Sequence, residues 1–157
     1  MKKIHMTPEG FKELEEELKN LKFVERPAVV NAISEARALG DLSENAEYQY
    51  AKNKQGFIEG RIKELEIKLS LAEVIDVTKL GGTGVKFGVT VTVCDHTTDE
   101  EVTYKIVGVD EADIKKGRIS VESPLARALI GRDVGDEVKL TTPSGKKQYE
   151  ILDVKYI

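Results

Sequence analysis

The sequence predicts an α+β protein, in which a long antiparallel α-helical hairpin is followed by a small antiparallel β-sheet domain with one short helix. In the first half of the chain, apolar side chains recur at helical spacing. In the second half they form short runs rich in Val, Thr, Tyr and Ile, several of which alternate with polar residues, as is typical of strands. We therefore expect a coiled-coil hairpin over residues 1–76 with its tip at 40–45, a glycine-rich linker over 77–84, and the sheet domain over 85–157.

Two stretches with heptad spacing predict the arms of the hairpin. The apolar positions are Phe11, Leu14, Leu18 and Leu21 in the first arm, and Ile58, Ile62, Leu65, Leu69 and Ala72 in the second. This spacing is typical of helices that pack along a narrow seam. In an antiparallel hairpin the numbers of facing residues add to a constant, and four pairs from the two lists share one constant. Half of this constant falls between Asp41 and Leu42, which is where the turn is expected.

Pro27 interrupts the first arm. An interior proline removes a backbone hydrogen bond and usually kinks or breaks a helix. Beyond it the apolar positions move by one residue, to Val29, Ile33 and Ala36. We interpret this shift as a kink or a local change of register within one arm, with a break into two helices as the alternative.

The residues of the tip predict how both helices end. Gly40 is suited to end the first helix, because glycine readily adopts the left-handed backbone of a helix terminus. Asp41 or Ser43 is expected to cap the second helix, with Glu44 and Glu47 favourably placed in its first turn.

Segments with strand character follow residue 84 at short intervals. They cover residues 89–93, 102–107, 119–121, 137–140 and 148–154. Residues 123–131 predict a short helix that begins at a Ser-Pro pair and ends at glycine. Residues 142–145 predict the turn of a hairpin between the last two strands.

The composition points away from several classes of protein. The chain has 157 residues and a formal net charge of −4, which argues against a protein whose main role is to coat duplex DNA. A single cysteine, Cys94, excludes an internal disulfide and suits a reducing compartment. The start of the chain lacks the apolar segment of a signal peptide, and no later run suits a membrane span. We expect a cytoplasmic protein that does not enter a membrane.

Asp41 and Glu44 are the strongest candidates for chemistry. Carboxylate oxygens are hard ligands that suit Mg²⁺, which usually takes only one or two protein carboxylates and keeps several waters. Two exposed carboxylates alone would hold this ion poorly, so the pair would form half of a site that a partner completes. The competing interpretation is structural, since acidic residues at the start of a helix commonly cap it or oppose its dipole.

Cations and a tyrosine lie near the tip. Arg37, Lys52 and Lys54 could contact a phosphate backbone or an acidic partner, or could simply form a solvated face. Tyr48 follows Glu44 by one helical turn and could stack on a base or pack at the tip.

Other chemistry has little support in the sequence. His5 and His96 have no Cys or His neighbours at the usual ligand spacing, which makes a zinc site improbable. The chain has no phosphate-binding GxxxxGK[ST] loop and no arrangement suited to nucleophilic catalysis. We therefore expect a protein without an active site of its own.

The stretch Ala36-Arg-Ala-Leu-Gly-Asp-Leu-Ser-Glu-Asn-Ala-Glu-Tyr48 resembles the tip signature of the Gre family of bacterial transcript cleavage factors. Further blocks that resemble the family lie at residues 6–10, 56–62, 74–77, 87–91, 106–113 and 123–127. The modest basic content near the tip is more similar to the GreA branch than to the GreB branch. The departures from the pattern are small, such as Lys52 where arginine is common.

The resemblance implies a function on RNA polymerase. In this family an FKBP-like C-terminal domain binds at the rim of the polymerase secondary channel, and the coiled coil reaches the active centre. The tip carboxylates, which match Asp41 and Glu44 here, help to hold a Mg²⁺ shared with the polymerase, and no cofactor is bound by the factor alone. The polymerase then cleaves the 3′ end of backtracked nascent RNA in the two-metal manner. The factor is thus a protein cofactor, not an enzyme.

The same match assigns roles to other residues. Arg37, Tyr48 and Lys52 would face the RNA, Ser123 and Pro124 would contact polymerase, and the factor would bind as a monomer. One alternative is a non-catalytic coiled-coil adaptor or an inhibitor of polymerase, although a single Asp and Glu at the tip favour a stimulator. A prolyl isomerase is a further alternative. It has less support, because such enzymes line their pocket with aromatic residues, which are few in this half of the chain.

Overall fold

The computed structural model describes residues 2–41 and 44–157, so Leu42 and Ser43 of the expected tip lie outside the described residues. The chain divides into two compact units. The first contains Phe11–Ala72, and the second combines Lys3–Gly10 with Glu73–Ile157.

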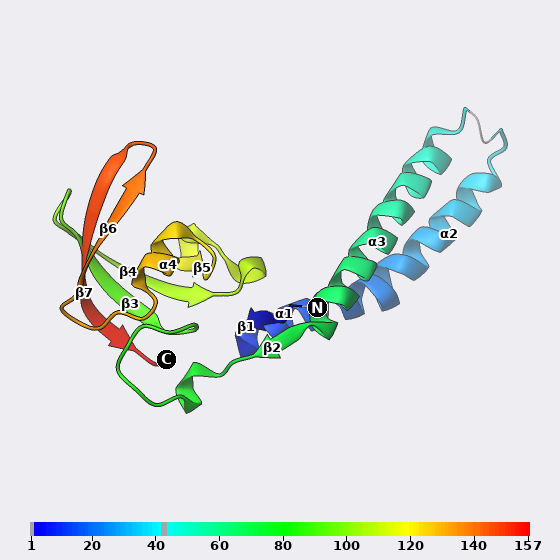
Figure 1. Ribbon diagram of the computed structural model, residues 1–157. Coiled ribbons are helices and arrows are strands. Elements are labelled where there is room, and N and C mark those ends of the chain that lie inside the picture. Colours follow the sequence, from blue (N-terminus) through cyan, green and yellow to red (C-terminus); the bar gives the residue numbers. More distant parts are fainter. Residues whose placement is uncertain (1, 42–43) are drawn as a thin grey trace. The chain divides into compact units, whose positions relative to one another are not determined.

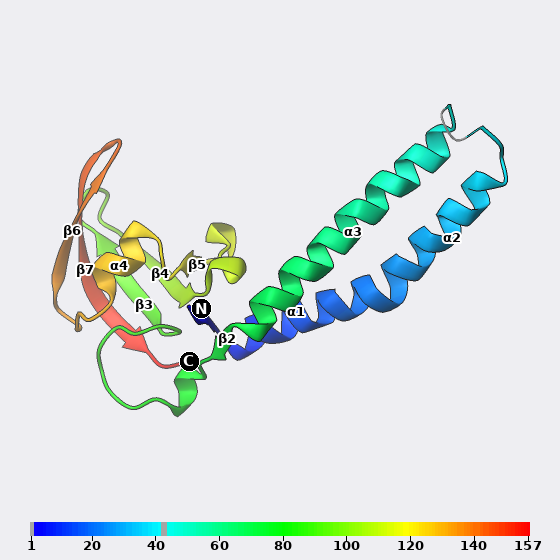
Figure 2. The same ribbon diagram turned by 45° about the vertical axis from the view of Figure 1, so that its right-hand side comes forward.

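The first unit is the predicted antiparallel helical hairpin. Its first arm consists of α1 (Pro8–Asn20), the π-helical segment η1 (Leu21–Glu25) and α2 (Arg26–Arg37), and its second arm is α3 (Ala46–Ser70). Figures 1 and 2 show α2 running beside α3. The buried side chains follow the predicted seam and its shift after Pro27. They are Leu14, Val29, Ile33 and Ala36 on the first arm, and Ala51, Ile58, Ile62 and Leu65 on the second. None of the described helices is long and apolar enough to cross a membrane.

The π-helical segment explains how the first arm accommodates Pro27. The N–H of Arg26 donates to the carbonyl of Leu21, five residues back, so this turn contains one residue more than an α-helical turn. The backbone remains right-handed at Asn20, Glu25 and Arg26, so the arm is continuous and not broken into two helices. The extra residue moves the seam by one position. The predicted change of register is therefore confirmed, and a π turn produces it.

Ion pairs join the two arms along their length. They are Arg26 with Glu59 (2.8 Å), Arg61 with Glu17 (2.6 Å), Lys22 with Glu66 (3.3 Å) and Lys54 with Glu25 (3.8 Å). The first two are bidentate, with both guanidinium contacts at 2.9 Å or less. Pairs this exposed contribute about 0–1 kcal/mol each, so their main effect is to favour one register over its neighbours.

The second unit is built on a five-stranded sheet with the order β5-β4-β3-β7-β6. The strands are β3 (Thr90–Asp95), β4 (Glu100–Val107), β5 (Arg118–Ser120), β6 (Glu137–Thr142) and β7 (Gly145–Lys155). Each predicted strand is present, and β6 and β7 form the predicted hairpin, with Thr142 opposite Gly145. Helix α4 (Pro124–Leu129) is the predicted short helix, and its Ala126 and Leu129 lie in the core.

The sheet is mostly antiparallel, as expected, because three of its neighbouring pairs are antiparallel and one is parallel. Strand β5 runs parallel to β4, with Ile106 opposite Ile119. A parallel neighbour requires a connection that crosses back along the sheet. Two short 3-10 helices, η3 (Val109–Glu111) and η4 (Ile114–Lys116), lie in this connection.

A small two-stranded sheet, not predicted from the sequence, forms from β1 (Ile4–Met6) and β2 (Ala72–Val74). The carboxylate of Glu111 anchors the chain after β1, because it accepts from the N–H of Thr7 at 3.1 Å and from the N–H of Gly108 at 3.0 Å. The Thr7 hydroxyl also donates to this carboxylate. Lys3–Gly10 therefore groups with the sheet in one compact unit.

The second unit resumes shortly before the expected linker. It resumes at Glu73, and the expected linker 77–84 begins with Val77, which is buried. Val77 starts the 3-10 helix η2 (Val77–Lys79) and packs in the core. That core consists of Val77, Val85, Val89, Val91, Val93, Ile106, Ile119, Ala126, Leu129, Val138, Tyr149 and Ile151.

Candidate functional site at the hairpin tip

Asn45 caps α3, which corrects the expectation that Asp41 or Ser43 does so. Its backbone is extended (φ −86°, ψ 100°), and its side-chain oxygen accepts from the N–H of Tyr48 at 3.0 Å. This is the usual geometry of an N-cap. Ser43 lies outside the described residues, and Asp41 precedes the cap by four positions.

The same Asn45 side chain connects the two arms. Its amide nitrogen donates to the carbonyl oxygen of Ala36 at 2.6 Å. That carbonyl belongs to the last turn of α2, where few intrahelical donors remain. Gly40 adopts a φ of +111°, so the predicted terminator does leave the helical conformation. One side chain therefore caps α3 and also closes the end of α2.

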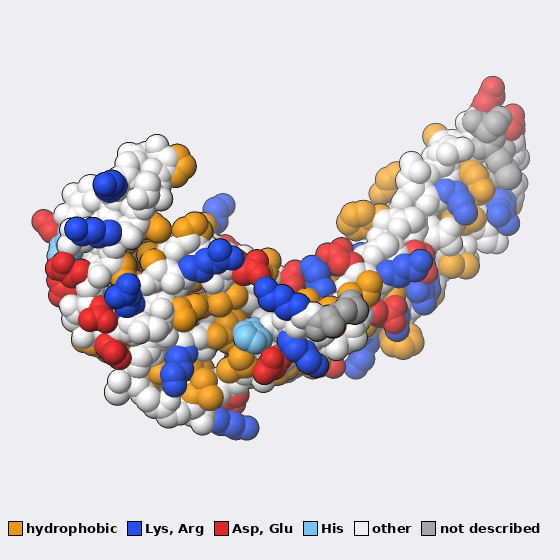
Figure 3. Space-filling view, in the orientation of Figure 1, with side chains coloured by type: hydrophobic (Ala, Val, Ile, Leu, Met, Phe, Trp, Pro, Cys, Tyr) orange, Lys and Arg blue, Asp and Glu red, His pale blue; other side chains and the backbone are white. Residues whose placement is uncertain are grey.

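Asp41 and Glu44 both belong to the expected tip, 40–45, and both are exposed. They line one surface hollow together with Leu39, Asn45, Ala46 and Glu47. Figure 3 shows acidic side chains gathered at the end of the hairpin. Two carboxylates on one hollow match the hard donor set of Mg²⁺, but they are too few to complete six-fold coordination alone. The two carboxylates could therefore supply part of a magnesium site that a partner would complete.

The structure brings together two of the three residues predicted to face RNA. The guanidinium carbon of Arg37, on α2, lies 5.9 Å from the ring centroid of Tyr48, on α3, at cation–π distance. Lys52 follows Tyr48 by four residues on the same helix, and its ammonium group donates to Gln55 at 3.2 Å. Residues four apart share a helix face. A cation, an aromatic ring and a second cation thus lie within two turns of the carboxylates.

Ser123 and Pro124, the predicted polymerase contacts, lie at the start of α4 in the sheet unit. The Ser123 hydroxyl accepts from the N–H of Ala126 at 3.2 Å and caps the helix. Pro124 occupies the first turn and is exposed. Ser123 thus has a structural role of its own, and Pro124 presents the accessible surface.

Two family models match nearly the whole chain. The model described as "Transcription elongation factor, N-terminal" matches residues 4–74, and "Transcription elongation factor, GreA/GreB, C-term" matches residues 81–156. The chain belongs to the Gre family of transcription elongation factors. This finding confirms the resemblance seen in the sequence.

Individual relatives agree with the assignment. A transcription elongation factor GreA of Ruegeria pomeroyi is 63% identical over 99% of both chains, and one of Caulobacter vibrioides is 60% identical over the full length of both. Among solved structures, the GreA factor homolog Gfh1 of Thermus thermophilus is 26% identical, with 98% of this chain and 99% of that chain covered and a TM-score of 0.45. The two GreA proteins confirm the similarity to the GreA branch.

This Gre-family protein is therefore a transcription elongation factor. Membership implies that it stimulates the RNA cleavage activity that RNA polymerase itself possesses. It is a protein cofactor of that reaction, as the sequence indicated, and the catalytic centre belongs to the polymerase.

Two contacts of this Gre factor were missed from the sequence. Asn45 directly precedes the first residue of α3, and a cap-forming residue at that position is a recognised signal for the start of a helix. The contact of Glu111 with Thr7 spans 104 positions, and no local pattern points to it.

Proposed function

We propose that this Gre factor carries Asp41 and Glu44 into the active centre of RNA polymerase, where the two carboxylates help to hold a Mg²⁺ shared with the enzyme. The observation that carries the proposal is the position of Asn45. Because Asn45 provides the helix cap and the contact between the arms, closure of the hairpin does not require the carboxylates as caps. The competing explanation was that Asp41 or Glu44 caps a helix. At the start of α3, Asn45 fills that role instead.

The chemistry divides between the ion and the chain. A Mg²⁺ in such a site lowers the pKa of a bound water and stabilises negative charge on the phosphate under attack. Asp41 and Glu44 would supply oxygen ligands, and the short backbone path between them keeps both at one end of the hairpin. Asn45 would act as a positioning residue, because it fixes the start of α3 immediately after Glu44.

We also propose that Arg37, Tyr48 and Lys52 face the backtracked RNA. Arg37 and Lys52 would contact phosphates, and Tyr48 offers a ring on which an unpaired base can stack. The contact between Arg37 and Tyr48 supports this role, since it holds a flexible cation beside the stacking surface.

Entry through the secondary channel of polymerase completes the proposal. The hairpin would enter the channel as a monomer, with Pro124 at the protein contact and Ser123 holding the start of α4 in shape. The place of action would be the bacterial cytoplasm, where polymerase transcribes. The isomerase alternative gains no support, because the rings of Phe87 and Tyr149 are each only 8% exposed and pack inside the unit.

The test uses a stalled, backtracked elongation complex with labelled RNA, incubated with Mg²⁺ and the factor. Asp41→Asn and Glu44→Gln should each slow cleavage roughly 100-fold, the scale on which a lost transition-state contact usually acts. More Mg²⁺ should partly restore cleavage, because a weakened site needs a higher ion concentration. Glu47→Gln is the matched control, since Glu47 lines the same hollow and lies in the first turn of α3.

Each alternative has its own outcome. Full cleavage by both variants would contradict the proposal and leave the carboxylates as structural residues. If the wild-type factor competes for polymerase but releases no RNA, it is an adaptor or an inhibitor. Equal losses in Glu47→Gln would mean that the charge of the tip matters, and not two specific ligands.

A further inference from the structure

The end of β3 carries a second group of potential metal ligands, remote in sequence from the tip. Within the described ranges, ligand atoms of Cys94, His96 and Asp99 all lie within 4.8 Å of one another. Those of His96, Glu137 and Glu150 meet the same limit. We expected no Cys or His neighbour of His96 at the usual ligand spacing, but in the structure the Cys94 thiol lies within 4.8 Å of a His96 nitrogen.

The register of the sheet explains why these side chains meet. Cys94 on β3 lies opposite Glu101 on β4 and opposite Glu150 on β7. Residues two apart on a strand, and residues directly opposite on neighbouring strands, point to the same face. His96 follows Cys94 by two positions and remains aligned with the sheet, because its N–H donates to the carbonyl of Gln148 at 2.9 Å.

The turn that presents the donors is held by another residue. Asp95 is buried, and its carboxylate accepts from the N–H of Thr97 at 2.9 Å. The N–H of Thr98 donates to the Asp95 carbonyl at 3.2 Å. Asp99 has a φ of +55°, a conformation that Asp and Asn tolerate better than most residues. Substitutions of Cys94 and His96 should therefore leave the turn folded.

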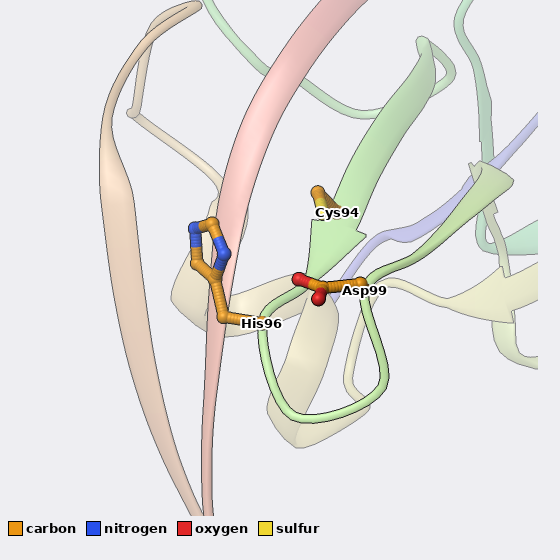
Figure 4. A group of neighbouring side chains, drawn as sticks. All are labelled: Cys94, His96 and Asp99. Carbon is orange, nitrogen blue, oxygen red and sulfur yellow. The ribbon is translucent and has the colours of Figure 1, made fainter.

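The two nitrogens of His96 face different groups. Nε2 lies 3.2 Å from a carboxylate oxygen of Glu150 and 4.0 Å from one of Glu137, which leaves Nδ1 for a ligand. Figure 4 shows one ring nitrogen of His96 on the side that faces Cys94 and Asp99. The Asp99 carboxylate extends from the turn toward this ring. Histidines that bind metals commonly donate their second nitrogen to a carboxylate in this way.

We propose that Cys94, His96 and Asp99 form a binding site for Zn²⁺ or a chemically similar divalent transition metal, with Glu150 orienting His96. A thiolate, an imidazole and a carboxylate form a donor set that suits Zn²⁺ and not Mg²⁺, and three protein ligands leave the fourth tetrahedral position to water. Metal–ligand bonds of about 2.0–2.3 Å place tetrahedral donors roughly 3.3–3.8 Å apart. Small side-chain rotations would therefore close the present separations around an ion.

The charges around the thiol favour a cation. The carboxylates of Asp99, Glu101, Glu150 and Asp95 lie close enough to the Cys94 thiol to act on it electrostatically. The same negative charges attract a dication, and its binding displaces the thiol proton.

Cobalt provides a direct test, because a thiolate bound to Co²⁺ gives a charge-transfer absorption that oxygen and nitrogen ligands do not. The reduced, untagged full-length protein should bind one Co²⁺ per chain with this absorption, and Zn²⁺ should displace it. Cys94→Ser should abolish the absorption. His96→Ala and Asp99→Asn should weaken binding at least tenfold, and Glu150→Gln roughly 10- to 100-fold, as outer-shell partners usually do.

Matched controls separate this site from others in the chain. His5 is the other histidine of the chain, and its Nε2 lies 3.4 Å from a carboxylate oxygen of Glu73. This pair resembles that of His96 and Glu150 but has no cysteine, so His5→Ala should leave the absorption unchanged. Asp41→Asn with Glu44→Gln should leave it unchanged too. Absence of the absorption in the wild type would overturn the proposal, even if Co²⁺ binds through His96, Glu137 and Glu150. So would one ion per two chains, or an absorption that persists at full affinity in His96→Ala and Asp99→Asn.

Discussion

The side-chain amide of Asn45 donates to the carbonyl oxygen of Ala36 at 2.6 Å, and this bond joins the two arms next to the tip of the hairpin. Ala36 is buried in the last turn of α2, and Asn45 is the cap of α3. The two helices are thus joined at the point where Asp41 and Glu44 lie. The contact ties the start of α3 to the end of α2.

Removal of this contact should weaken the hairpin. We expect Asn45→Ala to lower the free energy of unfolding by about 1–3 kcal/mol, the sum of a lost cap and a lost hydrogen bond. Asn45→Asp keeps an acceptor for the N–H of Tyr48 but cannot donate to Ala36, so its loss should be smaller. Urea unfolding followed by helical circular dichroism measures both. Unchanged stability in Asn45→Asp would show that the amide contact contributes nothing.

The pair of Arg37 and Tyr48 should act on cleavage and not on the fold. We expect Tyr48→Phe to retain activity, because the ring remains, and Tyr48→Ala to lose about 1–3 kcal/mol of binding to the cleavable complex, the usual value of one base stacked on an aromatic ring. Cleavage rates at varied factor concentration separate binding from the chemical step. A loss confined to thermal stability would assign Tyr48 to packing alone.

The π turn in the first arm should depend on Pro27. Deletion of the exposed Val24 removes the additional residue of the π turn and places Pro27 within a regular α-helix. This should cost about 3 kcal/mol, because the proline ring then collides with a carbonyl of the preceding turn.

The same deletion combined with Pro27→Ala should recover most of that stability and preserve the seam on both sides of the deletion. Urea unfolding of the three variants, with Pro27→Ala as the third, makes the comparison. If the deletion is equally harmful with alanine at position 27, the π turn has another cause.

Asp76 should give the sheet unit a dependence on acid pH. The hydroxyl of Thr78 donates to its carboxylate at 2.6 Å and the N–H of Thr78 at 3.0 Å, and these bonds keep the pKa of Asp76 below its ordinary value of 3.8. A lowered pKa contributes stability that is present above about pH 4, the range of an unperturbed Asp, and is lost as the pH falls through the folded pKa. NMR titration of Asp76 should show the low value.

Thr78→Val tests the cause of that shift. It removes the hydroxyl bond and should raise the pKa of Asp76 toward the ordinary value, whereas the same change at the exposed Thr83 should not. An unchanged titration of Asp76 in Thr78→Val would contradict the assignment.

The features that the sequence predicted well are those with a local cause. The hairpin seam follows from apolar side chains one or two turns apart, and Leu14, Ile62 and Leu65 are buried as expected. The register shift after Pro27 was also visible, since a proline and a displaced apolar series lie close together in the chain.

The features that were missed depend on partners far away in the chain. Several residues at the tip are able to cap a helix, and their local capping energies differ by less than about 1 kcal/mol. Asn45, the residue that caps α3, also makes a contact with Ala36, nine positions away. Glu111 contacts Thr7 across 104 positions, and no local pattern indicates that strand β5 runs parallel to β4.

The sequence by itself determined the two kinds of architecture, the seam of the hairpin, the strands and the family, because each rests on periodicity or on contiguous motifs. The tertiary structure alone decided which residue caps α3, where the units divide, and which side chains meet at the end of β3. Cross-strand register and long-range hydrogen bonds set these features, and they exist only once distant segments have packed together.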